Sequence, residues 1–171
     1  DVGTQAFKSG RVRLARERYR RTANFLSCGL MVPAGGPGSY RVENQAAARH
    51  LRNACWLNAA QCELHLKNHA PAKRYCDAVL HADPDNVKAR FRRATALVAL
   101  GDQELLAIED LNKVLVKDPS NAQAKQLLRQ ARHMQKQRDH SNAGLFRRAC
   151  ADLVDDFEAI KASLEVARAA D

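Results

Sequence analysis

Small, large and proline positions recur along this chain with the period of a paired-helix repeat. From Asn53 to Pro84 the spacing predicts two antiparallel helices, over about residues 53–66 and 70–82. Ala60 and Ala72 are expected where the two helices approach most closely, because a larger side chain there would force them apart. The positions that carry the pattern are Trp56, Ala60, Ala72, Cys76, Val79, Leu80 and Pro84.

The same pattern occurs a second time between Val87 and Pro119. Gly101-Asp102 is expected as the turn between the two helices of this unit. Pro84 and Pro119 are 35 residues apart, one more than the usual period of about 34. We expect a bulge or a longer turn near Leu105-Leu106 to absorb the additional residue. The small positions of this unit are Ala94 and Ala107, and its inward positions are Leu111, Val114 and Leu115.

These repeats predict an all-α protein, a solenoid of three helix-turn-helix repeats closed by a capping helix. The first repeat is expected to begin upstream of Asp1, because only its later positions, such as Ala15 and Tyr19, are present. Glycines and prolines after Ser27 indicate a flexible loop. The expected organisation is a repeat domain over residues 1–140, with repeats at about 1–26, 53–86 and 87–121, a loop at 27–44 and a capping helix at 122–138, followed by a helical extension over 141–171.

The C-terminal extension has an amphipathic pattern of its own. Apolar residues occur at helical spacing from about Leu145 to Ala170, and this helix is expected either to extend the solenoid or to project from it. With Arg147 and Arg148 beside Phe146, the stretch is also a candidate for calmodulin binding or for self-association. The apolar positions are Phe146, Leu153, Phe157, Ile160 and Leu164.

Composition narrows the class of protein further. Hydrophobic residues make up 46% of the 171 residues but aromatic residues only 5%, which favours closely packed helices over a β-sheet core. No run of about 18 apolar residues could cross a bilayer, so no membrane association is expected. The five cysteines are odd in number and form no Cys-x-x-Cys pair, which indicates reduced thiols in a cytoplasmic protein, with the nucleus as a second location.

The net charge of +9 favours an acidic partner. A dense group of six arginines lies between Arg11 and Arg21, but without an interleaved aromatic platform it indicates a solvated face rather than a nucleic-acid site. No cofactor or metal is expected, since Cys62, His65 and His69 lack a fourth ligand. No spacing of Ser, His, Asp or Cys supports catalysis.

Function is therefore expected on the concave groove that stacked helix pairs form, which can hold an extended peptide. Asn58 lies on the first helix of the second repeat, and Lys88 and Arg92 are four residues apart on the first helix of the third, so all three can face the groove. The two cations suit a peptide that ends in an acidic residue, and the Asn58 amide can donate to its terminal carboxylate. The alternative is that Lys88 and Arg92 belong to a solvated basic face.

At these positions the chain resembles the tetratricopeptide-repeat (TPR) domains of FKBP-type immunophilins and large cyclophilins. The resemblance rests on Gly3-Thr4, Phe7-Lys8-x-Gly10, Leu57-Asn58-x-Ala60, Lys88-Ala-Arg-Phe91-Arg92-Arg93 and the tail from Asn142 to Leu153. Such domains bind the C-terminal Glu-Glu-Val-Asp tail of heat-shock protein 90 through a carboxylate clamp of two lysines, two asparagines and an arginine.

The resemblance implies site roles for six residues of this chain. It places Asn58, Lys88 and Arg92 at clamp positions and Thr4 at the first asparagine position, while the first lysine position falls before Asp1. Phe7 and Lys8 are expected to line the same groove.

The function implied is that of a co-chaperone docking module without enzyme activity in this segment. Its expected partner is the C-terminal peptide of heat-shock protein 90, with that of heat-shock protein 70 as a second ligand, and an isomerase domain is expected upstream of Asp1. The alternative is a general scaffold that binds another protein or RNA through its basic surface.

Overall fold

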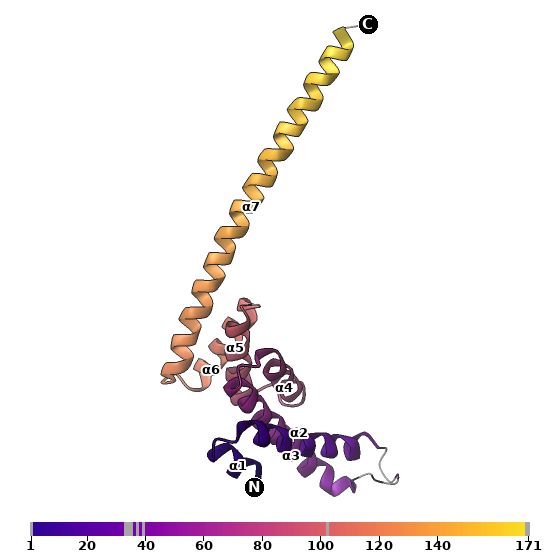
Figure 1. The fold of residues 1–171 in the computed structure, drawn as a ribbon, viewed down its shortest axis with the longest axis vertical. Helices are drawn as coiled ribbons and strands as arrows, with labels where there is room; N and C mark the ends of the chain where they lie inside the picture. The colour runs from indigo at the N-terminus through magenta and orange to yellow at the C-terminus, as the bar shows by residue number, and fades with distance from the viewer. Residues whose placement is uncertain (1, 33–35, 37, 39, 102, 170–171) are drawn as a thin grey trace. The chain divides into compact units, whose positions relative to one another are not determined.

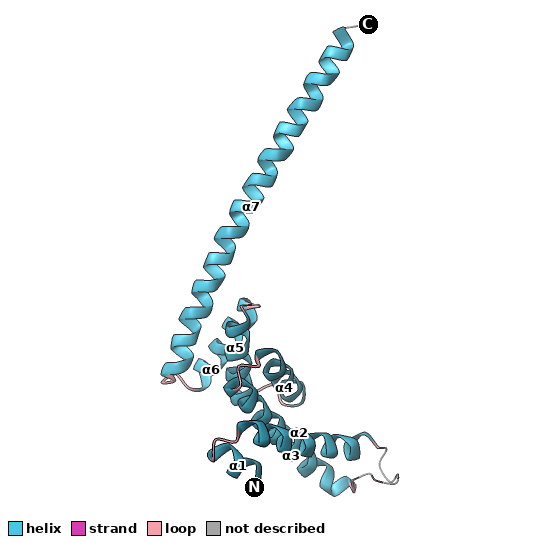
Figure 2. Cartoon of the chain, viewed as in Figure 1, coloured by secondary structure: helices cyan, strands magenta, loops and turns pink. Residues whose placement is uncertain are grey.

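The computed structural model describes residues 2–32, 36, 38, 40–101 and 103–169, and these residues form helices and connecting turns with no strand (Figures 1 and 2). The helices are α1 (Val2–Lys8), α2 (Val12–Met31), α3 (Val42–His65), α4 (His69–Ala82), α5 (Val87–Leu100), α6 (Glu104–Lys117) and α7 (Ala122–Ala169). The all-α prediction is confirmed. The chain divides into two compact units, Asp1–Arg132 and His133–Asp171, and α7 contributes residues to both.

Within the first unit, each helix from α1 to α5 packs against the next one in the chain. Helices α3 and α5, the first helices of two consecutive pairs, also contact each other, as expected for a solenoid. The four alanines predicted at small positions, Ala60, Ala72, Ala94 and Ala107, are fully buried. A larger side chain at such a position would be expected to cost about 1–3 kcal/mol through overpacking.

The repeated Asp-Pro-x-Asn sequence forms the turn that leads into the next helix. The Asn86 side chain accepts a hydrogen bond from the Ala89 backbone N–H (3.0 Å) at the start of α5 and donates to Asp83 (2.9 Å). At the start of α7, Asn121 accepts from the Ala124 N–H at 2.9 Å in the same way. Each asparagine satisfies a backbone donor that the helix leaves unpaired, which explains why the motif recurs with the repeat.

The connections between the paired helices have the same length, three residues after α3 and three after α5, but they differ in backbone conformation. Lys67 and Gly101 both adopt left-handed conformations, with φ of 61° and 67°, just after the first helix of their pairs. One residue separates Lys67 from α4, whereas two separate Gly101 from α6, including Gln103 with φ of 56°. The prediction of a bulge or longer turn near Leu105-Leu106 is wrong, since both residues lie inside α6. Asp102 of the expected turn lies outside the described residues.

Helices α2 and α3 are longer than the repeat pattern indicated. Helix α2 continues to Met31 and α3 begins at Val42, so both ends of the loop expected at 27–44 are helical. Gly29 lies within α2, and the Tyr40 ring occupies the space where a β-carbon of residue 29 would be. A residue with a side chain could not pack there without moving this ring. The expected loop residues 33–35, 37 and 39 lie outside the described residues.

Helix α7 is continuous from Ala122 to Ala169, where a capping helix ending at 138 and a separate extension were expected. Its sequence around His140-Ser141-Asn142 contains no proline, and three polar residues alone do not end a helix. In the first unit, Ala124, Leu128 and Ala131 of α7 are buried. No helix among the described residues has the length and apolar character needed to cross a membrane.

Candidate functional site

A pocket of about 180 Å³ in the first unit brings together side chains from α1, α2, α3 and α5. Four of the six predicted site residues line it, Thr4, Phe7, Asn58 and Arg92, together with Tyr19 and Gln61. Lys8 and Lys88, the other two, are exposed and do not line the pocket. Lys88 lies one helical turn before Arg92 on α5, so the two residues are on the same side of that helix.

Arg92 is the cation of this pocket, and the neighbouring helix fixes its position. Its Nη1 donates a hydrogen bond of 2.8 Å to the backbone carbonyl of Leu57 on α3. A guanidinium has five N–H donors, so this bond orients the group and leaves donors for a ligand. Burial lowers the pKa of Arg92 below its ordinary value, because the charged guanidinium is partly removed from water. An anion arriving there would meet a cation that is poorly solvated and already oriented.

Asn58 follows Leu57 directly, so the same contact between α3 and α5 brings the Asn58 amide beside Arg92. Gln61, three residues later on α3, adds a second amide to the pocket wall. The sequence prediction missed Gln61, although its spacing from Asn58 places it on the same helix face and could have indicated it. Two amides and a guanidinium together offer several N–H donors to a carboxylate.

Thr4 and Tyr19 form the hydroxyl side of the pocket. Their side-chain oxygens are 2.9 Å apart and hydrogen bonded, which ties α1 to α2. Gly3 allows this approach, because a β-carbon at residue 3 would lie 2.8 Å from the Tyr19 ring. Tyr19 was predicted as a repeat position and not as a site residue. Its hydroxyl is polar while its ring is buried in the core, a dual role that spacing alone does not reveal.

Phe7 supplies the apolar wall. Its ring meets that of His65 edge to face, with centroids 5.1 Å apart and an interplanar angle of 88°, and it packs against the buried cluster that contains Ala6 and Cys62. His65 and Cys62 are thereby used in packing. Burial raises the pKa of the Cys62 thiol to about 11, and no group of three or more potential metal ligands occurs in the described part of the chain.

The opposite side of α5 carries a buried ion-pair network. Arg93 lies 2.7 Å from the Asp110 carboxylate and 3.0 Å from that of Asp77, and Arg90 lies 2.9 Å from Asp110. Asp110 is fully buried. Burial alone would lower the pKa of Arg93, but the hydrogen bonds that it donates to both aspartates outweigh burial and raise that pKa. These arginines are neutralised inside the stack and are not available to a ligand.

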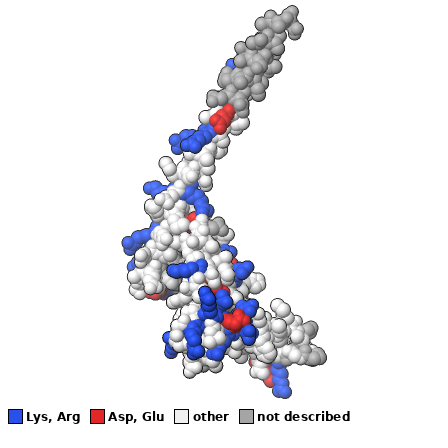
Figure 3. All heavy atoms as spheres, viewed as in Figure 1, with Lys and Arg blue, Asp and Glu red and all other residues white. Residues whose placement is uncertain are grey.

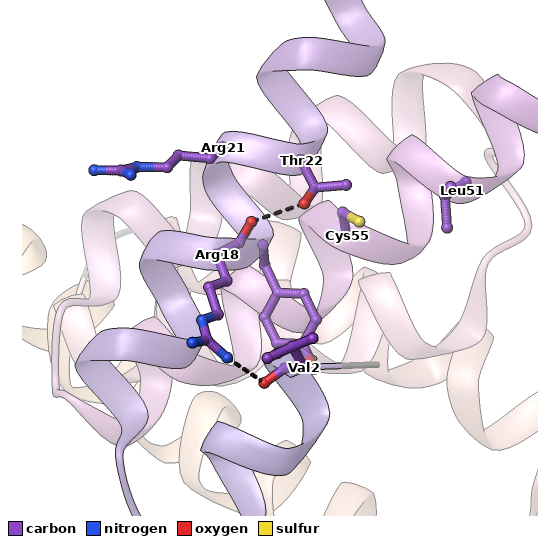
Figure 4. A pocket seen from close by; sticks show the side chains of 8 residues that line it. Val2, Arg18, Arg21, Thr22, Leu51 and Cys55 are labelled. Atoms are coloured by element: carbon purple, nitrogen blue, oxygen red, sulfur yellow. Dashed lines mark hydrogen bonds between the residues drawn. The ribbon is translucent and has the colours of Figure 1, made fainter.

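A larger hollow, of about 460 Å³, borders Tyr19 from the side of Val2 and Leu51 (Figure 4). Arg18, which lines it, donates a hydrogen bond of 2.9 Å to the Val2 carbonyl, and Thr22 donates to the Arg18 carbonyl at 2.9 Å. Apart from Tyr19, this hollow shares no lining residue with the smaller pocket, and it contains none of the six predicted site residues.

Much of the positive charge of α2 has a partner. Hydrogen bonds from Arg20 and Arg21 lower the pKa of Glu17 to about 2, so this carboxylate stays ionised between them. Arg16 lies 3.8 Å from the buried carboxylate of Glu63. In Figure 3, Asp and Glu side chains accordingly lie among the Lys and Arg side chains of the surface shown.

Comparison with known proteins finds FK506-binding proteins among the relatives of this chain, although no protein-family model matches it. It is 36% identical over 126 residues to the FK506-binding protein-like of Mus musculus, and 35% identical over 123 residues to the peptidyl-prolyl cis-trans isomerase FKBP4 of Homo sapiens. The alignments cover 74% and 72% of this chain but 32% and 25% of those proteins. The chain thus spans between a quarter and a third of their length.

Solved structures with this fold are TPR domains. The C-terminal TPR-containing domain of a Plasmodium falciparum FK506-binding protein matches with a TM-score of 0.70 at 21% identity, over 81% of this chain and 86% of that one. The second TPR domain of human RPAP3, in complex with the HSP70 peptide SGPTIEEVD, gives 0.56 at 26% identity, over 77% and 90%. The first TPR of Spaghetti (RPAP3), bound to the HSP90 peptide SRMEEVD, gives 0.57 at 24%, over 77% and 85%.

TPR domains are binding modules, so this segment is a binding module and not an isomerase domain. The predicted solenoid fold is confirmed by the structural matches. The chain is therefore similar in sequence to FK506-binding proteins over about three quarters of its length, 74% and 72% in the two alignments, and its fold is that of a TPR domain.

Proposed function

We propose that this domain binds the acidic C-terminal tail of heat-shock protein 90, and that of heat-shock protein 70 as a second ligand, through a carboxylate clamp. The observation that carries the proposal is the pocket in which Thr4, Phe7, Asn58 and Arg92 meet, residues drawn from helices far apart in the sequence. The RPAP3 domain with 26% identity, solved with a peptide ending in Glu-Glu-Val-Asp, supports a ligand of this class.

Arg92 and Lys88 contribute differently to anion binding. The half-buried Arg92 is held by the Leu57 carbonyl and makes charge-assisted hydrogen bonds to a peptide carboxylate. Each hydrogen bond to a charged group contributes about 1.5–3 kcal/mol. The exposed Lys88 contributes less, because water and salt screen its charge.

Asn58 donates to the terminal carboxylate, and the Thr4 hydroxyl lies across the pocket as a further polar group. Phe7 offers the apolar surface against which the valine before the terminal aspartate packs. A pocket of about 180 Å³ has room for the end of the tail and not for a whole peptide. Preceding residues therefore lie along the exposed face of α5 near Lys88.

The test is calorimetric titration with the peptide Ser-Arg-Met-Glu-Glu-Val-Asp, as the free acid and as the C-terminal amide. We expect the free acid to bind, and both amidation and the Lys88→Ala/Arg92→Ala double substitution to weaken binding strongly. Lys113→Ala on α6, which removes one exposed lysine paired with Glu109, is the matched control and should bind normally. Equal binding of acid and amide by the folded protein would refute the clamp.

Charge reversal on α2 separates this proposal from binding through the basic surface. Arg20→Glu removes one of the two arginines that pair with Glu17, and Arg20 is not among the residues that line the pocket. The clamp proposal expects unchanged affinity for the peptide. A loss larger than that caused by Arg92→Ala would favour a scaffold that uses its basic face.

A further inference from the structure

In the second unit, α7 exposes a row of large apolar side chains. Phe146, Leu153 and Phe157 are 72%, 68% and 65% exposed, whereas Leu128, in the part of the same helix that belongs to the first unit, is 8% exposed. Leu145 and Val154 are exposed beside them. An apolar surface of this extent indicates an interaction site.

The spacing of these residues is that of a coiled coil. Phe146, Cys150, Leu153 and Phe157 are separated by four, three and four residues, and the sequence continues the alternation with Ile160 and Leu164. A repeat of seven with two apolar positions keeps one seam facing a partner helix along its whole length. In this register Cys150, Phe157 and Leu164 occupy position a, and Phe146, Leu153 and Ile160 occupy position d.

We propose that this segment of α7 forms a parallel two-stranded coiled coil with a second copy of the chain. We assign a second copy of α7 as the partner of this apolar row, because a two-stranded coiled coil requires the heptad period in both helices and α7 has it. The C-terminal unit is then a dimerisation element, independent of the peptide groove, and each assembly presents two grooves to its ligands.

Charges beside the seam specify the parallel orientation. Positions e and g of the register include Arg147, Asp156 and Lys161. In a parallel pair, position g of one helix lies beside the following e of the other, which matches Asp156 with Lys161 of the second copy. An antiparallel pair that overlaps fully would instead bring Arg147 near Lys161 of the second copy, two like charges. The sequence therefore favours the parallel arrangement.

A disulfide between the two copies of Cys150 would identify the parallel orientation directly. Cys150 is exposed in the single chain, and at position a of a parallel coil the two copies of Cys150 face each other across the seam. Diamide oxidises two such thiols to a disulfide by accepting their two electrons and two protons, and is itself reduced to the hydrazine. Cys28, the other exposed cysteine, is replaced by serine in this experiment, while Cys55, Cys62 and Cys76 are buried.

Sedimentation of the whole chain over a wide range of concentrations tests the proposal. We expect a dimer that dissociates on dilution, a monomer for Leu153→Glu/Phe157→Glu, and a dimer for the control Arg148→Glu, which lies off the seam. All three proteins should bind the acidic peptide equally at each groove, which shows that the first unit is folded in each. Loss of the dimer with intact peptide binding therefore tests the coiled coil separately from the proposed clamp.

Three outcomes would overturn the coiled coil. A monomer at every concentration would exclude self-association, and calcium-dependent binding of calmodulin by that monomer would assign the apolar row to calmodulin instead. An unchanged dimer in Leu153→Glu/Phe157→Glu would place the contact elsewhere. A dimer of Cys28→Ser that gives no diamide cross-link through Cys150 would exclude the parallel orientation.

Discussion

Two neighbouring arginines of α5 show how differently one residue type can be used. Arg92 faces the pocket, is held by one backbone carbonyl, and has a pKa lowered by burial. Arg93, the next residue, faces the interior of the stack, where Asp110 and Asp77 pair with it and raise its pKa. The groove side of α5 therefore has a cation available for a ligand, whereas the charge on the interior side is satisfied by the fold.

This difference shows why a count of charges is a poor guide to the binding surface. The net charge of +9 is spread over many arginines, of which several are paired with Glu17, Glu63, Asp77 or Asp110. What distinguishes Arg92 is its place among amides and an aromatic ring. Substitutions on the two sides of α5 should accordingly separate stability from binding.

The largest effect is expected on the interior side. Asp110→Asn leaves two arginines without their shared buried carboxylate, so we expect the free energy of unfolding to fall by about 3–5 kcal/mol. Urea denaturation followed by circular dichroism measures this change. The neighbouring Glu109→Gln, which alters an exposed pair with Lys113, should leave the midpoint nearly unchanged. An equally small effect of Asp110→Asn would show that the network does not support the fold.

On the groove side, Arg92→Ala should weaken binding of the free-acid peptide by about tenfold to a hundredfold, since it removes charge-assisted hydrogen bonds. Its effect on unfolding should be smaller than that of Asp110→Asn, because no buried carboxylate loses its partner. Calorimetry and urea denaturation of the same variant measure both quantities. A variant that loses stability but keeps its affinity would reverse the roles assigned to the two sides.

Lys88→Ala should reduce affinity by only a few-fold, because its ammonium is exposed and screened. The reduction should shrink as salt is added, whereas most of the Arg92 contribution should persist. Titrations at low and high ionic strength, with Lys113→Ala as the control, resolve the two cations. If Lys88→Ala had the larger effect at high salt, the anchor of the peptide would lie outside the pocket.

A further effect is expected only in alkaline solution, through the buried Cys76 thiol of α4. Burial raises the pKa of Cys76 to about 12 from an ordinary value of 9.0, and its charge interactions reach Arg92 and Arg93. The unfolded chain loses this proton at a lower pH than the folded protein does, so stability falls as the pH rises above about 9 and up to about 12. The urea midpoint should fall less steeply with pH in Cys76→Ala, and equal slopes would exclude this thiol as a cause.

Much of the first unit could be predicted from its sequence, because repeated local chemistry determines repeated structure. The buried alanines and the Asp-Pro-x-Asn turns each have a local physical cause, and so they recur with the period. The repeat correspondence and the family resemblance predicted that Asn58 and Arg92 face one groove, and both line the pocket. Gln61 and Tyr19 were missed because the repeat pattern says nothing of which polar atoms converge from separate helices.

Regions outside the repeat pattern were predicted less well. The early start of α3 at Val42 and the continuity of α7 past His140 both involve stretches of ordinary helix-forming residues that no repeat position marks. The turn after α5 contains two left-handed residues, Gly101 and Gln103, a backbone conformation that hydrophobic spacing does not encode.

The central claim is that the groove side of α5 and α3 holds the terminal carboxylate of an acidic peptide, and a double-mutant cycle tests it most directly. The affinities of the free-acid and amidated peptides are measured for the natural chain and for Asn58→Ala. We predict a coupling energy of about 1 kcal/mol or more, with amidation costing much less affinity in Asn58→Ala. Equal losses on amidation in the two proteins would show that Asn58 does not bind the carboxylate and would contradict the clamp.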